Sequence, residues 1–166
     1  MFHGVRFYGV NRGQLQFTTI PSRVLQFSCD LQLGRFIYRA DIPGLGEGHV
    51  LSTTLTLKPF PPFELDLSYS RSRLSDLYSD RLFFDGSITR LAGIYHLTGD
   101  LFVRLISQYD QFNRAVEIDP LVSYKLNPFT IFYAGSTHSM TQFGGEFGIR
   151  QTARQFFVKL QYLWRE

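Results

Sequence analysis

Cysteine is nearly absent from this sequence, and no metal-binding pattern stands in its place. The only cysteine among the 166 residues is Cys29, which excludes an internal disulfide and a cysteine metal cluster. The four histidines are far apart and show no ligand spacing such as HxH or HExxH; they are His3, His49, His96 and His138. We therefore expect no metal site and no cofactor.

Long apolar runs are missing as well. The longest segment without a charged residue, 126–145, contains Pro128, three glycines and many hydroxyl side chains. It cannot form the roughly 20-residue apolar helix that crosses a bilayer. The first residues also lack the basic and apolar regions of a secretory signal. We expect either a cytoplasmic protein or the C-terminal part of a longer protein whose signal lies upstream.

Runs of basic residues are equally absent. The 17 Lys and Arg residues are interspersed with 14 Asp and Glu residues, which leaves a net charge of only +3. Nucleic-acid binding relies on clustered basic side chains that neutralise phosphates. The sequence therefore predicts no nucleic-acid partner.

Aromatic residues and period-two alternation are what the sequence does contain. Phe, Tyr and Trp make up 16% of the chain, and apolar residues make up 44% although the mean hydropathy is only −0.08. Apolar and polar residues alternate in segments such as 49–58, 63–74 and 101–112, as in β-strands with one apolar face. We predict an all-β fold, an antiparallel meander of about nine or ten strands, in a single β-barrel domain over residues 1–166.

Two places depart from simple alternation. In residues 1–48, the sequence Asn11–Gly13 is open to two interpretations, a hairpin turn or a bulge within one long strand. In residues 84–97, Phe84 and Ile88 have one parity while the later apolar residues have the other. A β-bulge near Thr89 would reconcile the two halves.

The apolar face could look into a soluble core or out into lipid, since both give the same alternation. The connections predicted from the sequence alternate between short turns such as LTGD and LNPF and long loops such as DIPGLGEG and SRLSDLYSD. Outer-membrane barrels have this asymmetry, together with aromatic residues near strand ends. We therefore predict a transmembrane β-barrel, or part of one, in the bacterial outer membrane, with outer-membrane lipid as a partner.

The two faces then receive different roles. The charged side chains that we assign to the barrel lumen are Glu64, Asp66, Arg104, Asp110 and Lys159. The last strand carries large apolar residues at every second position, and it resembles the strand that barrel-assembly machinery recognises; these residues are Phe156, Val158, Leu160, Tyr162 and Trp164. Two residues follow Trp164, whereas the usual pattern ends on the aromatic residue.

Few residues suggest catalysis. His138 and Ser139 are adjacent, so on a strand they point to opposite faces and cannot form a hydrogen-bonded dyad. Glu64 and Asp66 share a face and could serve glycoside hydrolysis or calcium binding, but pairing with lumen cations explains them more simply. We expect no catalytic residues.

Arg71 and Arg73 continue the lipid-facing parity of their strand toward a long loop. There they would contact anionic lipid headgroups.

Several segments resemble the C-terminal β-barrel region of a large bacterial family of unknown function, whose members carry an N-terminal module similar to family-nine carbohydrate-binding domains. The most specific element is DP-L-SYKLNPFT-FY-GSTH in residues 119–138, followed by RQFF-K-QYL in residues 154–163. The resemblance covers residues 48–166 well and the first fifty residues loosely. It implies an outer-membrane location, an upstream carbohydrate-binding-like module and a barrel completed by strands not present here. It implies no reaction.

Three hypotheses of function follow. The first is a membrane anchor or pore for glycan or nutrient handling, in which the lumen charges tune passage. The second is a barrel-embedded hydrolase, which needs a serine, a histidine and a carboxyl group together on one face. The third is a soluble β-barrel that binds an apolar ligand.

Overall fold

The computed structural model describes residues 7–39, 43–79, 81–142 and 148–164. These residues form nine strands and no helix. The strands are β1 (Arg12–Thr19), β2 (Leu25–Tyr38), β3 (Gly44–Phe60), β4 (Phe63–Asp76), β5 (Leu82–His96), β6 (Leu101–Asp110), β7 (Ala115–Asn127), β8 (Thr130–Gln142) and β9 (Ile149–Tyr162).

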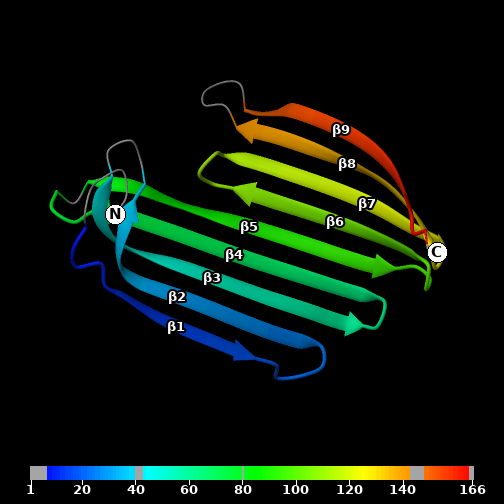
Figure 1. Cartoon of the computed structure of the whole chain (residues 1–166), viewed down its shortest axis with the longest axis horizontal. Coiled ribbons are helices and arrows are strands. Elements are labelled where there is room, and N and C mark those ends of the chain that lie inside the picture. The colour runs from blue at the N-terminus through cyan, green and yellow to red at the C-terminus, as the bar shows by residue number, and fades with distance from the viewer. Residues whose placement is uncertain (1–6, 40–42, 80, 143–147, 165–166) are drawn as a thin grey trace.

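Each strand pairs antiparallel with the next one along the chain, so the sheet order is β1 to β9 without a crossover (Figure 1). The predicted all-β antiparallel meander is thus confirmed. β1 and β9 lie at opposite edges and do not pair with each other, so the sheet of the described residues is open. Within the described residues no helix is long and apolar enough to cross a membrane.

The connections fall into two sets at opposite ends of the sheet. At the turn end they cover residues 20–24, 61–62, 97–100 and 128–129, and at the loop end residues 39–43, 77–81, 111–114 and 143–148. The loop end therefore has the longer connections, but the difference is smaller than the sequence predicted. Residues 143–147, within the predicted glycine-rich loop, lie outside the described residues.

The predicted long loops DIPGLGEG and SRLSDLYSD are partly wrong. Residues 44–48 already belong to β3, because they continue the antiparallel pairing with residues 34–38 of β2. β4 likewise continues to Asp76, opposite Gly46 of β3. Glycine-rich and serine-rich sequence thus adopts strand where a neighbouring strand offers backbone partners.

The two irregularities expected from the sequence also differ from the structure. β1 begins at Arg12, so neither a hairpin turn nor an internal bulge occurs at Asn11–Gly13. Pairing of β5 runs unbroken past Thr89, and the register shift lies instead beside Leu74, near the loop end. Phe84 keeps its apolar side chain on the face opposite the later apolar residues, because the rings of Tyr38 and Phe112 lie there, 6.4 and 6.1 Å from its ring centroid.

The register shifts at four places, all toward strand ends, and the unbroken pairing between them gives the sheet two chemically distinct faces. The apolar face includes Leu15, Phe17, Phe27, Leu31, Leu51, Leu55, Leu65, Leu67, Leu91, Val103, Leu105, Val122, Val158 and Leu160. The polar face includes Gln14, Asp30, Ser52, Thr54, Glu64, Asp66, Ser68, Arg90, Arg104, Gln108, Glu117, Asp119 and Lys159.

The apolar face is the more exposed of the two. On the polar face Leu74 and Ser123 are only 3% and 2% exposed, whereas Leu105 on the apolar face is 50% exposed. The curvature of the sheet is visible in Figure 1. The exposures indicate that this curvature shelters the polar side, so the apolar side chains form the outer surface.

The hydrophobic core is correspondingly thin. Leu45, Leu74 and Leu121 are the buried hydrophobic residues of the described part of the chain, and no large side chain there is fully buried. The accessible surface is 11976 Å², whereas a compact monomer of 19.2 kDa exposes about 8,400 Å². Many large apolar side chains lie on the exposed surface, among them Leu15, Leu105 and Val158; extended exposed apolar patches mark sites of contact with a partner or a membrane.

Replacement of Gly48 by alanine is expected to destabilise the sheet. A Cβ atom there would meet the carbonyl oxygen of Arg73 on β4, so the two backbones would have to separate. Steric overpacking of this kind costs about 1–3 kcal/mol. Urea unfolding followed by circular dichroism measures the loss. Gly99→Ala is the control, because nothing lies within 4 Å of a Cβ atom there; equal effects of both changes would contradict the close β3–β4 approach.

Candidate functional site

The five predicted lumen charges all lie on the polar face. Glu64 on β4 and Arg104 on β6 both pair with Ile94 of β5, so they lie in one row across the strands. Asp66 lies two residues further along β4, in the next row on the same face. Asp110 and Lys159 lie on the same face of β6 and β9. The sequence thus placed these side chains on one face, but they are spread along it and do not form one cluster.

Each acidic residue of this set has a local partner. The Lys58 ammonium lies 2.8 Å from the Glu64 carboxylate. The Thr56 hydroxyl donates to Asp66 at 2.5 Å, and the backbone N–H of Phe112 donates to Asp110 at 2.8 Å. The hypothesis that Glu64 and Asp66 act as a carboxylate pair gains no support from these contacts.

Arg104 differs from the other predicted lumen charges. Its Nε atom is buried and has no hydrogen-bond partner among the described residues, and the same is true of the Oδ1 atom of Asp119 on β7. Asp119 is the register partner of Ile106, two residues along β6 from Arg104. An unpaired buried polar atom costs about 1–3 kcal/mol. A further polar group that paired with Arg104 Nε or Asp119 Oδ1 would therefore stabilise the polar face.

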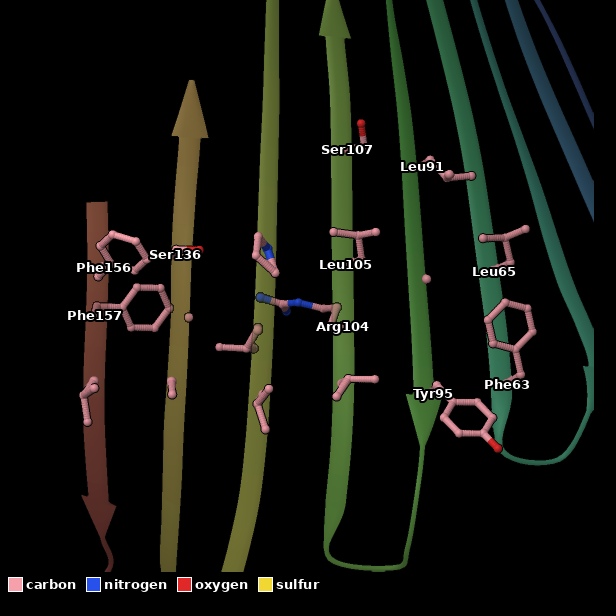
Figure 2. Close-up of a pocket in the computed structure, with 18 residues that line it drawn as sticks. Phe63, Leu65, Leu91, Tyr95, Arg104, Leu105, Ser107, Ser136, Phe156 and Phe157 are labelled. Atoms are coloured by element: carbon pink, nitrogen blue, oxygen red, sulfur yellow. The ribbon is translucent and has the colours of Figure 1, made fainter. Parts of the chain in front are cut away.

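An open trough of about 820 Å³ crosses the sheet from β4 to β9. Most of its lining residues belong to the apolar face, among them Leu65, Leu91, Leu105, Pro120, Val122 and Phe156. Figure 2 shows Phe63 and Leu65 at one side of the trough and Phe156 and Ser136 at the other. The trough is thus mainly an apolar depression on the apolar face.

A serine–histidine pair interrupts the apolar face at β8. The Ser136 hydroxyl and the Nε2 atom of His138 are 3.0 Å apart, and the His138 ring meets the edge of the Phe156 ring at 6.1 Å between centroids. His138 and Ser139 do face opposite sides, as their register partners indicate. The sequence reasoning missed Ser136, although its spacing of two residues from His138 is the signal for a shared strand face.

Arg71 and Arg73 share a carboxylate on the apolar-face side of the loop end. Arg71 donates to both oxygens of Asp85 at 3.3 Å, and Arg73 Nε lies 4.0 Å from the same carboxylate. The three side chains therefore carry one net positive charge. The predicted headgroup contact stays a prediction, with this cluster as its site.

The terminal strand exposes its apolar residues strongly. Phe156, Val158, Leu160 and Tyr162 all lie on the apolar face, and Val158 is 70% exposed. Trp164 follows the end of β9, and its ring centroid lies 6.2 Å from that of Tyr162. Two aromatic side chains therefore meet at the turn end of this edge strand.

Asp76, the last residue of β4, organises the connection to β5. Backbone N–H groups of Tyr78 and Ser79 donate to its carboxylate at 2.8 and 2.9 Å. These hydrogen bonds favour the charged form, so the pKa of Asp76 lies below its ordinary value. The charged carboxylate thereby fixes the loop next to the Arg71 and Arg73 cluster.

Comparisons of this chain with protein-family models, with curated proteins and with solved structures found no match. The candidate site consists of the exposed apolar face, its trough and the polar residues at its loop end.

Replacement of Glu64 by glutamine is expected to leave the free energy of unfolding nearly unchanged, because its ion pair with Lys58 is largely exposed and screened by water. Urea unfolding measures the change. Lys58→Gln is the matched variant and should have an equally small effect. A loss of several kcal/mol would indicate that Glu64 has a structural role that its contacts do not reveal.

Proposed function

We propose that this chain is a membrane-embedded β-sheet, part of the wall of a bacterial outer-membrane β-barrel, which serves as an anchor for associated domains. The apolar face contacts lipid, and the polar face turns toward the barrel interior. The observation that carries the proposal is the large exposed apolar face of a sheet whose hydrophobic core is almost absent. In lipid, such a face requires no protein partner.

The height of the apolar band supports this orientation. On β4 the apolar face runs from Phe63 to Arg71, and on β9 it runs from Tyr162 to Arg154. Both intervals contain eight residue steps, or about 26 Å along the strand. At a strand tilt of about 40° this is about 20 Å across the bilayer, close to the apolar band of about 25 Å in known barrels. Arginine side chains extend outward from such a boundary.

The turn end has the composition of an interfacial girdle. The ring centroids of Phe60 and Phe63 are 5.5 Å apart, and both rings lie 6.4 Å from the ring of Tyr95. Tyr162 and Trp164 form a similar pair at the β9 edge. Aromatic side chains favour the level of the lipid headgroups, so aromatic clusters at the same end of two distant strands support a membrane interface at that end.

Strand direction favours a sheet that forms only part of a barrel. In an antiparallel meander of nine strands, β1 and β9 run in the same direction. Direct closure would make a parallel pair, whereas bacterial barrels are antiparallel with an even number of strands. Edge groups left unpaired in lipid cost several kcal/mol each. An odd number of further strands would satisfy both edges.

A soluble barrel with an apolar ligand inside is less well supported. That arrangement needs the apolar face on the sheltered side, whereas the most sheltered side chains, Leu74 and Ser123, belong to the polar face. A hydrolase would need a carboxyl group beside Ser136 and His138, and no ion pair or hydrogen bond joins one to His138 in the described residues.

Replacement of Leu105 by arginine is expected to impair membrane assembly. Leu105 lies midway along the apolar part of β6, and arginine at the bilayer midplane costs about 2–4 kcal/mol. Gln108→Arg is the control, because Gln108 lies on the polar face of the same strand. Refolding into phosphatidylcholine vesicles, followed by protease resistance, measures assembly. Equal yields for the two variants would contradict the assignment of faces.

Trp164 provides an internal probe of membrane contact, since it is the sole tryptophan of the chain. Its fluorescence should be quenched by phosphatidylcholine brominated near the headgroup end of the acyl chain, and less by bromine near the chain terminus, because Trp164 belongs to the proposed interface. Absence of quenching by any brominated lipid would argue for a soluble protein and would overturn the proposal.

A further inference from the structure

Three polar side chains lie at neighbouring positions on the apolar face of β8 and β9. His138 and Arg154 are register partners, and Ser136 lies one pleat closer to the turn end on the same face. The Ser136 hydroxyl is 3.0 Å from the Nε2 atom of His138. The Arg154 guanidinium lies over the ring of Phe156, 4.5 Å from its centroid. This part of the apolar face thus has a hydroxyl, an imidazole and a cation within a few residues.

The positive charge of Arg154 is uncompensated among the described residues, since the ion pairs found there do not include it. Arg71, at the same boundary on β4, differs because Asp85 balances its charge. An arginine without a carboxylate partner, next to an apolar surface, is suited to bind an anionic oxygen such as a phosphate.

Ser136 lies between the position of Arg154 and the trough. It is only 7% exposed, yet it lines the trough together with Phe156, Pro120 and Val122, and Figure 2 shows it level with Phe156. The volume of about 820 Å³ is within the range of about 300–1,000 Å³ of ligand sites. An apolar chain in the trough would therefore have a hydrogen-bonding hydroxyl beside it.

The spacing of these groups matches a glycerophospholipid. Ser136 lies two residues, about 6.6 Å along the strand, from the level of His138 and Arg154, on the side of the membrane interior. A phospholipid has its ester carbonyls below its phosphate and its acyl chains below both. When His138 donates from Nε2 to the Ser136 oxygen, the serine hydroxyl is left to donate to a carbonyl.

We propose that β8 and β9 form a specific site for one anionic glycerophospholipid. Arg154 binds the phosphate, His138 orients the Ser136 hydroxyl through its Nε2 atom, Ser136 donates a hydrogen bond to an ester carbonyl, and one acyl chain occupies the trough. This site rests on the proposed function, because it requires the apolar face to meet lipid.

Native mass spectrometry of the full chain in a neutral detergent, titrated with phosphatidylglycerol, tests the phosphate contact. Arg154→Gln should weaken binding about tenfold, the effect of losing one charge-assisted hydrogen-bonded ion pair. Lys159→Gln is the matched control, because it removes the same charge from the other face of β9. Equal weakening by both variants would mean general attraction to positive charge and would overturn the site.

The ester contact has its own test with ether-linked phosphatidylglycerol, which lacks the carbonyls. The wild-type chain should bind the ester lipid about threefold to tenfold more tightly than the ether lipid. Ser136→Ala should abolish this preference and Ser139→Ala, on the opposite face of β8, should retain it. A wild-type chain that binds both lipids equally would overturn the assignment of Ser136.

Quenching of Trp164 by brominated lipid separates the two proposals. Normal quenching with no effect specific to Arg154 or Ser136 would overturn the lipid site and leave the membrane-embedded sheet intact. Loss of quenching in the wild-type chain would overturn both.

Discussion

The hydrogen-bonded register between neighbouring strands is the constraint on which the rest of this structure depends. Side chains alternate between the two faces at every residue, so a slip of one residue in any strand pair would exchange its apolar and polar sets. Eight successive antiparallel pairs keep the same parity from Leu15 on β1 to Leu160 on β9. Because parity is kept, the apolar side chains form one continuous surface.

That surface changes the usual balance of stability. A soluble domain offsets the loss of chain entropy mainly by burying apolar side chains, but here Leu45, Leu74 and Leu121 are the buried hydrophobic residues of the described chain. Backbone hydrogen bonds hold the strands together, and in the proposed function the acyl chains of a membrane would cover the apolar face. The polar face needs its own partners, as the unpaired buried atoms of Arg104 and Asp119 indicate.

Sequence patterns predicted the fold class and the membership of the two faces because strand parity is a local property. The five proposed lumen charges and the apolar residues of the terminal strand lie on the faces expected for them. Strand ends were harder to predict, since residues 44–48 become strand only through pairing with β2. The bulge expected near Thr89 was wrong because Phe84 packs with rings from β2 and the β6–β7 loop.

The candidate site was only partly predictable for the same reason. His138 was identified from the sequence, but its partner was sought at the adjacent residue, and the pair with Ser136 followed from the strand geometry. The alignment of Arg154 with His138 requires the register of β8 against β9, which no local pattern contains. The trough likewise combines residues from six strands.

The strictly sequential order of the sheet has a consequence for how it assembles. Every strand pairs only with its neighbours in the chain, across short connections, so each new hairpin requires the closure of a small loop and little entropy is lost at each step. The sheet can thus lengthen one strand at a time from either edge, and each added strand leaves a fresh edge for the next.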